Sequence, residues 1–341
     1  MKLEPVSILN EPVAEALPPD SPSGCQPVPP WVLERCPRHV STDRMPLPGG
    51  PRQSHTPGTQ IEVSHRSGTD AALISATLRG CRALPADQFQ SAVTASFLAV
   101  FAALARTSAP HAVRMWNFIP GIHDPLRPGE DRYRVFNAGR FDAFQRWLQR
   151  LAAASGTGHA QSLPAATGVG HFSDDLVIHA LGARSPGQPV ENPLQTPAYL
   201  YSSAHGPRPP CFSRATVTNL GDQSQRPTLL VSGTGSIRGE ASRHEGDLVG
   251  QFAESIENIE RLAASIQSPP GFALSGVETA RVYHTTLADG GWISQAIRAK
   301  LPRSAAIEVL HGVICRPELL VEIEATIGSP AAEHGRVPTC A

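Results

Sequence analysis

Apolar residues in the first half of the chain recur with two different periods. Helical spacing covers residues 86–108, a stretch rich in helix formers, and residues 139–156. Strand-like runs cover 112–122, which stops at a Pro-Gly pair, and 174–183. The order in this half is therefore helix, strand, helix, strand.

The second half of the chain repeats this order. Helical spacing returns at 246–266 and 291–301. Strands are expected at 227–236, 279–286, 306–314 and 319–327. Alternating helices and strands are typical of α/β proteins, and the repeated order predicts two copies of one α/β unit.

Prolines set the N-terminal region apart from the two units. Many of the 33 prolines fall in the first 58 residues, in stretches such as "ALPPDSPSGCQPVPPW". We therefore expect residues 1–58 to form an extended, turn-rich arm. The units are then expected at 59–190 and 191–330, followed by a short tail at 331–341.

Composition narrows the classes of partner. The formal net charge of the 341-residue chain is −1, which argues against nucleic acid and anionic membranes as partners. No apolar run approaches the roughly 18 residues that span a bilayer, and the N-terminus lacks the apolar core of a secretory signal. The six cysteines are scattered without a CxxC pair, so we expect reduced thiols, no structural metal and a cytoplasmic location.

The strand "LLVEIEATI" (319–327) carries two acidic residues on one face. Glu322 and Glu324 alternate with apolar positions, and Cys315 lies seven residues before Glu322 on a neighbouring strand or in the same hairpin. A solvated strand face explains the two acids as well as chemistry does. A buried apolar role explains Cys315 equally well.

Arginines and tyrosines form two clusters. The stretch "DRYRVFNAGR" includes Tyr133 and places Arg140 at the start of the helix expected at 139–156, where backbone N–H groups favour anions. The stretch 199–217 adds Tyr201 and Arg214. Any single arginine is more often a surface residue, but two such clusters fit a pocket for a small carboxylate better.

Other motifs are weaker. "SGTGSIRG" (232–239) follows a strand, but its third glycine is displaced from the dinucleotide-binding pattern, so a tight turn or a close backbone approach explains it better. The 13 histidines show no metal-binding spacing, and His244 fits a structural role at a helix end.

Several irregular motifs occur in a fixed order. They are "RMWNFIPGIH", "RYRVFNAGR", "LPAATGVGH", "ENPLQTPAYLY", "GPRPPCFSRA", "SGTGSIRGEASRHEGD" and "VICRPELLVEIEA". Between residues 112 and 326 the chain resembles the chorismatases, which include the 3-hydroxybenzoate synthases. The resemblance implies two RidA-like (YjgF) α/β units in one chain, with mixed sheets covered by helices on one side.

The resemblance also implies roles for individual residues. Glu322 would be the general acid that protonates the enolpyruvyl methylene of chorismate, with Glu324 as a bystander. Tyr133, Arg140, Tyr201 and Arg214 would bind the substrate dianion. Cys315 and Gly235 match the subgroup that releases 3-hydroxybenzoate and pyruvate rather than a dihydroxycyclohexadiene carboxylate. No cofactor or metal is implied, and a monomer is expected.

The chain departs from the family pattern at several positions. His284 and Thr285 stand where an arginine is usual, His123 where an asparagine is common, and Val313 where an aspartate is common. The missing arginine matters most, and it leaves open an amino analogue of chorismate as substrate or an altered product ratio. Because some family members also release 4-hydroxybenzoate, the resemblance leaves this product open as well. The alternatives are a hydrolytic chorismatase and a non-catalytic RidA-like protein that binds a small carboxylate.

Overall fold

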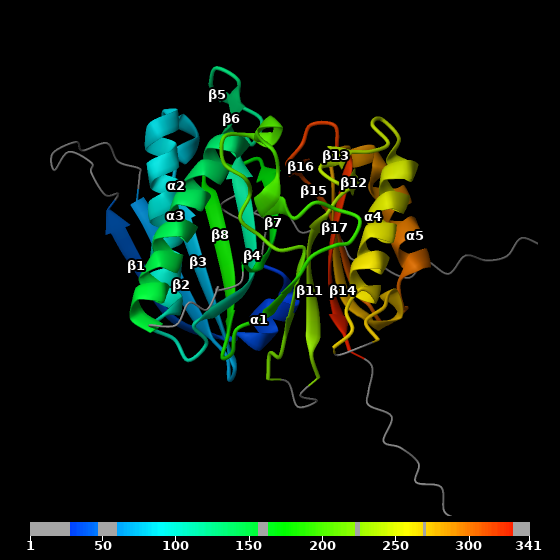
Figure 1. Cartoon of the computed structure of the whole chain (residues 1–341), viewed down its shortest axis with the longest axis horizontal. Coiled ribbons are helices and arrows are strands. Elements are labelled where there is room, and N and C mark those ends of the chain that lie inside the picture. The colour runs from blue at the N-terminus through cyan, green and yellow to red at the C-terminus, as the bar shows by residue number, and fades with distance from the viewer. Residues whose placement is uncertain (1–27, 47–59, 156–162, 222–225, 269–270, 330–341) are drawn as a thin grey trace, which may run out of the picture.

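Two α/β units lie side by side in the structure, a computed structural model that describes residues 28–46, 60–155, 163–221, 226–268 and 271–329. Figure 1 shows the units with their helices on opposite outer sides. Most of the expected N-terminal arm and the expected tail at 331–341 lie outside the described residues.

The first unit consists of five strands and two long helices. In chain order these elements are β2 (Gln60–Ser67), β3 (Ala71–Leu78), α2 (Ala86–Leu104), β4 (His111–Pro120), α3 (Arg132–Ser155), β7 (Ala165–His171) and β8 (Leu176–Ala183). The strands pair in the order β2-β3-β8-β4-β7, with β4 and β7 parallel and the other pairs antiparallel.

The second unit has the same sequence of elements. They are β10 (Ala215–Thr218), β11 (Thr228–Thr234), α4 (Leu248–Ala264), β14 (Val277–His284), α5 (Gly290–Lys300), β15 (Ala306–His311) and β17 (Val321–Gly328). Their sheet order, β10-β11-β17-β14-β15, matches that of the first unit strand for strand, and its one parallel pair, β14 with β15, lies in the same place. The predicted repeat of one α/β unit with mixed sheets is confirmed.

The helices of each unit cover only one face of its sheet. In the first unit α2 and α3 pack on the sheet through phenylalanines such as Phe97 and Phe144, and in the second α4 and α5 pack on apolar residues of β14 and β17. The other faces of the two sheets meet, and Trp116, Leu230 and Tyr283 share one buried cluster between them. Side chains that face this inner layer, including the acids of β17, are therefore buried.

Part of the expected arm is folded rather than extended. Pro30–Arg35 forms α1, and Arg38–Pro46 forms β1, which pairs with β2 and extends the first sheet by one strand at this edge. Trp31 packs edge-on against Trp116 at 6.1 Å between ring centroids. The prediction was wrong here because β1 is an edge strand with mostly exposed side chains, so it lacks the alternation of a half-buried strand.

Helix α3 begins at Arg132, seven residues earlier than expected. Gly139, which suggested a helix start, lies inside the helix. A Cβ atom there would lie 2.6 Å from the carbonyl oxygen of Gln90 and 2.8 Å from Val93. The glycine is therefore explained by the close approach of α2 to α3.

The strand expected over 306–314 is divided between the two sheets. β15 ends at His311, and after Gly312 the short strand β16 (Val313–Ile314) pairs with β7 of the first unit. The chain then returns to the second sheet as β17. This crossing places the residues after β16 at the junction of the two units.

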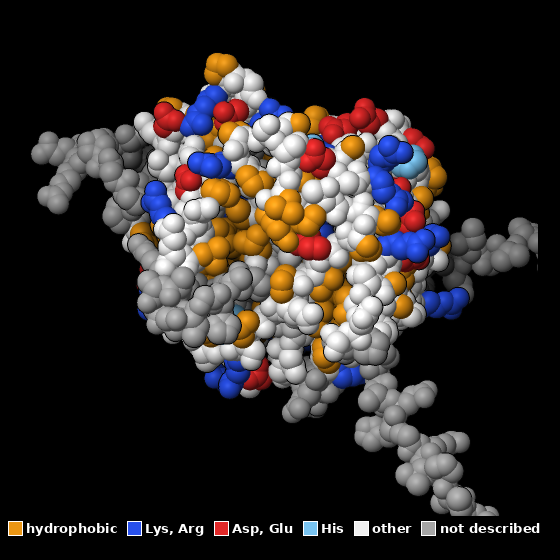
Figure 2. All heavy atoms as spheres, in the orientation of Figure 1, with side chains coloured by type: hydrophobic (Ala, Val, Ile, Leu, Met, Phe, Trp, Pro, Cys, Tyr) orange, Lys and Arg blue, Asp and Glu red, His pale blue; other side chains and the backbone are white. Residues whose placement is uncertain are grey.

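The remaining strands are short. They are β5 (Pro125–Arg127), β6 (Glu130–Asp131), β9 (Gln188–Val190), β12 (Ile237–Arg238) and β13 (Ala241–Ser242). No helix in the described ranges is both long and apolar enough to cross a membrane. On the face drawn in Figure 2, basic and acidic side chains are interspersed, and hydrophobic side chains gather near the middle.

Candidate active site

A cavity of about 280 Å³ lies at the junction of the two units. All seven residues singled out from the sequence line it, namely Tyr133, Arg140, Tyr201, Arg214, Gly235, Cys315 and Glu322. They come from α3, from the segments around β10 and β11, and from the crossing between β16 and β17. The structure therefore brings together positions that are up to 189 residues apart in the chain.

Glu322 lies on the face of β17 that points between the two sheets. The residue is 4% exposed, and its Oε1 atom has no hydrogen-bond partner among the described residues. Burial and, to a smaller extent, the negative charge of Glu324 raise the pKa of Glu322 to about 8. The open alternative of a solvated strand position is thus excluded, and the carboxyl group can hold a proton at neutral pH.

An irregularity in the neighbouring strand makes room for this carboxyl group. The pairing of β11 with β17 shifts between Val231 and Thr234. Gly233 lies in this interval, and a Cβ atom there would lie 2.0 Å from Oε1 of Glu322. Bulges commonly redirect a side chain next to an active site, and this one requires glycine.

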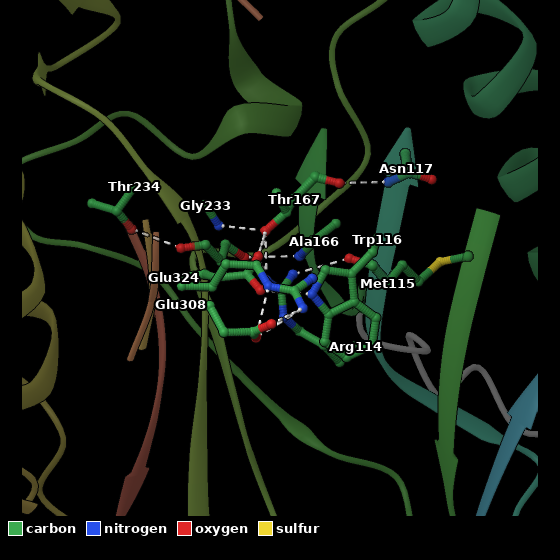
Figure 3. A network of polar contacts seen from close by, with 12 residues as sticks. Arg114, Met115, Trp116, Asn117, Ala166, Thr167, Gly233, Thr234, Glu308 and Glu324 are labelled. Carbon is green, nitrogen blue, oxygen red and sulfur yellow. Dashed lines mark hydrogen bonds and ion pairs between the residues drawn. The ribbon is translucent and has the colours of Figure 1, made fainter. Parts of the chain in front are cut away.

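Glu324 does not lie on a solvated strand face, the interpretation that the sequence left open for the acids of this strand. It is buried, and its carboxylate accepts hydrogen bonds from Arg114 at 2.8 Å, Trp116 Nε1 at 2.9 Å and Thr167 Oγ1 at 2.5 Å. Figure 3 shows these groups converging from β4, β7 and β17. That interpretation fails because the face of β17 that carries the acids is covered by the other unit.

Arg140 and Arg214 present two guanidinium groups to the cavity. They are 2% and 4% exposed, and the Nε atom of each has no partner in the described part of the chain. Arg140 Nη2 donates to Asn137 Oδ1 at 2.9 Å, and Arg214 Nη2 donates to the hydroxyl of Tyr201 at 2.6 Å. Arg140 lies beside no described carboxylate within ion-pair distance, and Arg214 lies near the buried carboxyl group of Glu191, whose pKa is raised to about 7 by burial. An anionic ligand would therefore add to the negative charge that faces these two cations.

One aromatic ring contacts both guanidinium groups. The centroid of Phe212 lies 5.7 Å from Cζ of Arg140 and 5.4 Å from Cζ of Arg214. Arg140 lies more than two turns inside α3, so the expectation that it uses the helix N-terminus is wrong. Its position instead depends on this aromatic contact and on Asn137.

Cys315 follows β16, which belongs to the first sheet, whereas Glu322 belongs to the second. The predicted hairpin or pair of neighbouring strands is therefore wrong, although both side chains line the same cavity. Burial, followed by the nearby charge of Glu322, raises the pKa of the Cys315 thiol to about 12. The thiol is thus protonated and is poorly suited to act as a nucleophile.

Gly235 lies after β11 at another wall of the cavity. A Cβ atom there would lie 3.2 Å from Cδ1 of Leu319 and 3.7 Å from the carbonyl oxygen of Val321. An alanine at this position would therefore press on the segment that leads into β17. This contact ties the size of residue 235 to the position of the strand that carries Glu322.

Sequence reasoning missed several lining residues. Arg316 stacks over the Tyr201 ring at 5.4 Å and donates to the carbonyl oxygen of Glu240 and to Ser242, which also donates to Glu318. Thr167 and Gly233 also line the cavity. Arg316 was detectable from its place directly after Cys315, but no local pattern distinguishes Thr167 from an ordinary strand residue.

Three of the departures from the family pattern lie together outside this cavity. His123, Thr285 and Val313 line a second hollow of about 260 Å³, behind the segment that carries Cys315. The buried His284 bonds through Nδ1 with the carbonyl oxygen of Thr286 and does not line the first cavity. His244 has a left-handed backbone, with φ of 57°, and Asp247 rather than His244 caps α4.

Metal ligation finds no support in the described part of the chain. No group of three or more His, Cys, Asp or Glu side chains is arranged there to hold a metal ion. The cysteines described, Cys36, Cys81, Cys211 and Cys315, are free thiols.

Comparisons with known proteins point to one family. The family model for "Chorismatase FkbO/Hyg5-like, N-terminal" matches residues 51–182. A 3-hydroxybenzoate synthase from Streptomyces hygroscopicus is 34% identical over 259 residues, which cover 72% of this chain and 72% of the relative. A chorismatase from Streptomyces rapamycinicus is 32% identical over 247 residues, or 70% of this chain and 71% of the relative.

A solved structure shares the fold. A crystal structure of a chorismatase superposes with a TM-score of 0.65 at 24% sequence identity and covers 85% of this chain and 99% of its own. At this level of identity the likeness concerns the fold alone. It agrees with the predicted architecture of two α/β units with mixed sheets in one chain.

Proposed function

Because the chain belongs to the chorismatase family, we propose that it converts chorismate to 3-hydroxybenzoate and pyruvate in the cavity between its two units. The observation that carries this proposal is Glu322. A buried carboxyl group with a raised pKa and an unpartnered oxygen faces a cavity that also holds two buried arginines. Such a combination is typical of a general acid beside an anion-binding site.

The arginines account for the substrate charge. Chorismate carries two carboxylates, and Arg140 and Arg214 each bring a buried cation whose Nε atom has no hydrogen-bond partner among the described residues. Tyr201 positions Arg214 through its hydroxyl group. We assign one carboxylate to each guanidinium, with the ring of Phe212, which contacts both guanidinium groups, as an apolar wall.

Glu322 supplies the proton that starts the reaction. Its carboxyl proton moves to the terminal methylene carbon of the enolpyruvyl group, which leaves an oxocarbenium-like centre at the ether carbon. The ether bond to the ring then breaks, and pyruvate leaves. The raised pKa keeps the acid protonated near neutral pH, where an ordinary glutamic acid would be ionised.

The composition of the products requires no water. Chorismate without pyruvate already has the composition of 3-hydroxybenzoate. The oxygen of the ring hydroxyl, rather than water, can therefore form a bond to the ring carbon from which the enolpyruvyl group leaves. The hydroxyl proton can return to the Glu322 carboxylate as the oxygen bridges the two ring carbons. The bond from this oxygen to its original carbon then breaks, the carbon that keeps the oxygen loses its hydrogen as a proton, and one proton is taken up by the oxygen, which gives the aromatic ring and its hydroxyl group. We assign Cys315 and Gly235 to shaping this part of the site, because both line the cavity with Glu322.

Purified protein with chorismate tests the proposal directly. Pyruvate release is followed in a coupled assay, and the aromatic product is identified by chromatography. Turnover in ¹⁸O-labelled water is expected to give 3-hydroxybenzoate without label in its hydroxyl group. A diene product with solvent oxygen would support the hydrolytic alternative, and chorismate binding without pyruvate release would support the non-catalytic binder.

A further inference from the structure

Two buried carboxyl groups two residues apart on β17 have opposite environments. Glu324 is bonded to Arg114, Trp116 and Thr167. Glu322, on the same face of the strand, leaves Oε1 without a partner in the described part of the chain. One carboxyl group is thus fully committed to the protein, whereas the other is open to the cavity.

Thr167 connects these two groups through the backbone. Its hydroxyl donates to Glu324 Oε2 and accepts from Arg114 Nη2 at 2.5 Å and from the backbone N–H of Gly233 at 3.0 Å. The hydroxyl hydrogen and both lone pairs are therefore used. Gly233 is in turn the residue whose missing Cβ leaves room for Oε1 of Glu322.

Several charged or titratable groups surround the pair. Arg114 comes from β4, Tyr283 and Arg281 of β14 lie opposite Glu322 and Glu324 in the ladder, and Arg281 is paired with Glu308 of β15 at 2.8 Å. Arg214, Tyr133 and Cys315 face Glu322 from the cavity side. Arg114 and Arg214 lower the pKa of Glu322, whereas burial and the charge of Glu324 raise it. The protonated form of Glu322 therefore depends on burial and on Glu324.

We propose that Glu324 is the positioning residue of this site: its charge keeps the proton on Glu322, and its bond to Thr167 fixes the Gly233 turn against which Glu322 rests. The inference rests on the proposed role of Glu322 as the general acid. Two negative charges this close cannot both form easily in a buried site, so the ionised member favours the protonated form of the other.

The two parts of the proposal call for different substitutions. Glu324→Gln keeps the shape and removes the charge, so Glu322 ionises more easily. We expect the pH at which kcat/KM declines to move down by about one unit or more. Above that pH, a shift of one unit corresponds to an activity about tenfold below the wild type.

Thr167→Val keeps the charge of Glu324 and removes the bond to Gly233. We expect kcat to fall about tenfold or more because Glu322 is misplaced. The decline of kcat/KM should stay at the wild-type pH. If Glu324 and Thr167 had merely structural roles, one substitution would not change the pH dependence alone while the other changed kcat alone.

Infrared titration of the protonated carboxyl band gives a readout that does not depend on activity. The band is assigned to Glu322 by its loss in Glu322→Gln, and its titration midpoint should move down in Glu324→Gln. Glu324→Asp restores the charge and should return the midpoint toward that of the wild type. An unchanged midpoint in folded Glu324→Gln would overturn the electrostatic part of the proposal.

Glu324→Gln leaves Arg114 buried without its partner, and this variant could fail to fold for that reason. The double variant Arg114→Gln with Glu324→Gln removes both charges and serves as the second test. Glu324 lies on the same face of β17 as Glu322, two residues away, whereas Arg114 reaches this face from β4, so loss of both charges should still leave the midpoint below that of the wild type. A midpoint at or above the wild-type value would refute the inference.

Failure of the inference can be distinguished from failure of the proposed function. If Glu322→Gln still releases pyruvate at the wild-type rate, Glu322 is not the acid, and the proposed function and this inference both fall. If Glu322→Gln is inactive and Glu324→Gln keeps the wild-type pH dependence, only the role of Glu324 is refuted. If Thr167→Val keeps the wild-type kcat, the positioning route through Gly233 is refuted.

Discussion

Strands β8 and β17 occupy the same place in the two units, yet only β17 takes part in the candidate site. Each strand lies between the second strand of its unit and the strand that follows the first helix. The register of β3 with β8 is regular over eight residue pairs, whereas that of β11 with β17 is interrupted between Val231 and Thr234. The interruption gives one copy of the repeat room for a carboxyl group beside the cavity.

Both strands bury a titratable group, and the comparison shows that burial alone does not make a site. His179 of β8 is bonded through Nδ1 to Ser75 at 2.7 Å, and burial lowers its pKa to about 3, so the imidazole is neutral. Glu322 of β17 is likewise held neutral, with a pKa raised to about 8. Only Glu322 faces a cavity, and a perturbed pKa indicates function only together with access to a ligand.

The corresponding helices α3 and α5 also differ in whether they contribute to the cavity. The first-unit helix α3 contributes Tyr133 and Arg140 to the cavity, whereas its counterpart α5 contributes none of the lining residues. The first unit therefore supplies part of the proposed binding groups, and the second supplies the acid. Neither copy of the repeat contains the whole candidate site.

Substitution of the two strand residues should separate activity from stability most strongly. We expect Glu322→Gln to lower pyruvate release by about 10²–10⁴-fold, because the amide cannot donate a proton to carbon. His179→Gln should retain turnover and lose about 1–3 kcal/mol of stability, because a buried hydrogen bond is disturbed. Steady-state kinetics and chemical denaturation measure the two effects.

The pH dependence of stability checks the same pair. The pKa of Glu322 is raised from an ordinary value of 4.5, so between about pH 4.5 and 8 the unfolded chain releases a proton that the folded protein keeps. Stability of the wild type should therefore fall relative to Glu322→Gln as the pH rises through this window. If the wild type and an inactive Glu322→Gln variant showed the same change in stability between these pH values, Glu322 would not be held neutral in the fold.

Substitution of the two arginines that line the cavity should give the next largest effect. Arg140→Ala and Arg214→Ala should each weaken chorismate binding by roughly 2–5 kcal/mol, because a buried substrate carboxylate loses its cation. Arg298→Ala on the exposed side of α5 is the matched control and should bind as the parent does. Each of these substitutions is combined with Glu322→Gln, so that chorismate is not converted, and calorimetry then measures the affinity for chorismate. Unchanged affinity in both would place the carboxylates elsewhere.

The sequence predicted the repeat well because long amphipathic segments such as 246–266 have a clear helical period. The clusters of arginines and tyrosines and the strand with two acids drew attention to most of the seven lining residues, and the resemblance then implied a role for each. Sequence reasoning failed where the deciding contact comes from the other unit. Nothing local distinguishes the buried Glu324 from a solvated strand residue, or Gly139 between two helices from a helix start.

The irregularity in β11 offers a substitution of intermediate effect. Gly233→Ala would place a Cβ atom 2.0 Å from Oε1 of Glu322, so the carboxyl group must move. We expect kcat to fall by roughly 10–100-fold, with a smaller change in affinity, because misplacement of about 1 Å can cost about 10²-fold. Gly291→Ala in α5, where no atom lies within 4 Å of the added Cβ, is the control. Equal kcat values for the two variants would show that the irregularity does not position the acid.

The smallest expected effect is a change in product rather than in rate. Cys315 and Gly235 lie on the walls where the two units meet, and an added Cβ at residue 235 would lie 3.2 Å from Leu319. Cys315→Ala enlarges one wall, and Gly235→Ala presses on the segment that enters β17. Together they should loosen the fit around the substrate ring, so that water competes with the ring hydroxyl. We expect the double variant to release pyruvate within about tenfold of the wild-type rate. This is about 1.4 kcal/mol, near the low end of the roughly 1–3 kcal/mol that one methylene is worth in a pocket. Its product should shift from 3-hydroxybenzoate toward the dihydroxycyclohexadiene carboxylate, and chromatography of both products from ¹⁸O-water measures the partition.

If the product ratio stays unchanged while Cys315→Ala and Gly235→Ala each alter the rate, the outcome of the reaction is decided by other groups. The hollow lined by His123, Thr285 and Val313 behind Cys315 is then the next place to substitute.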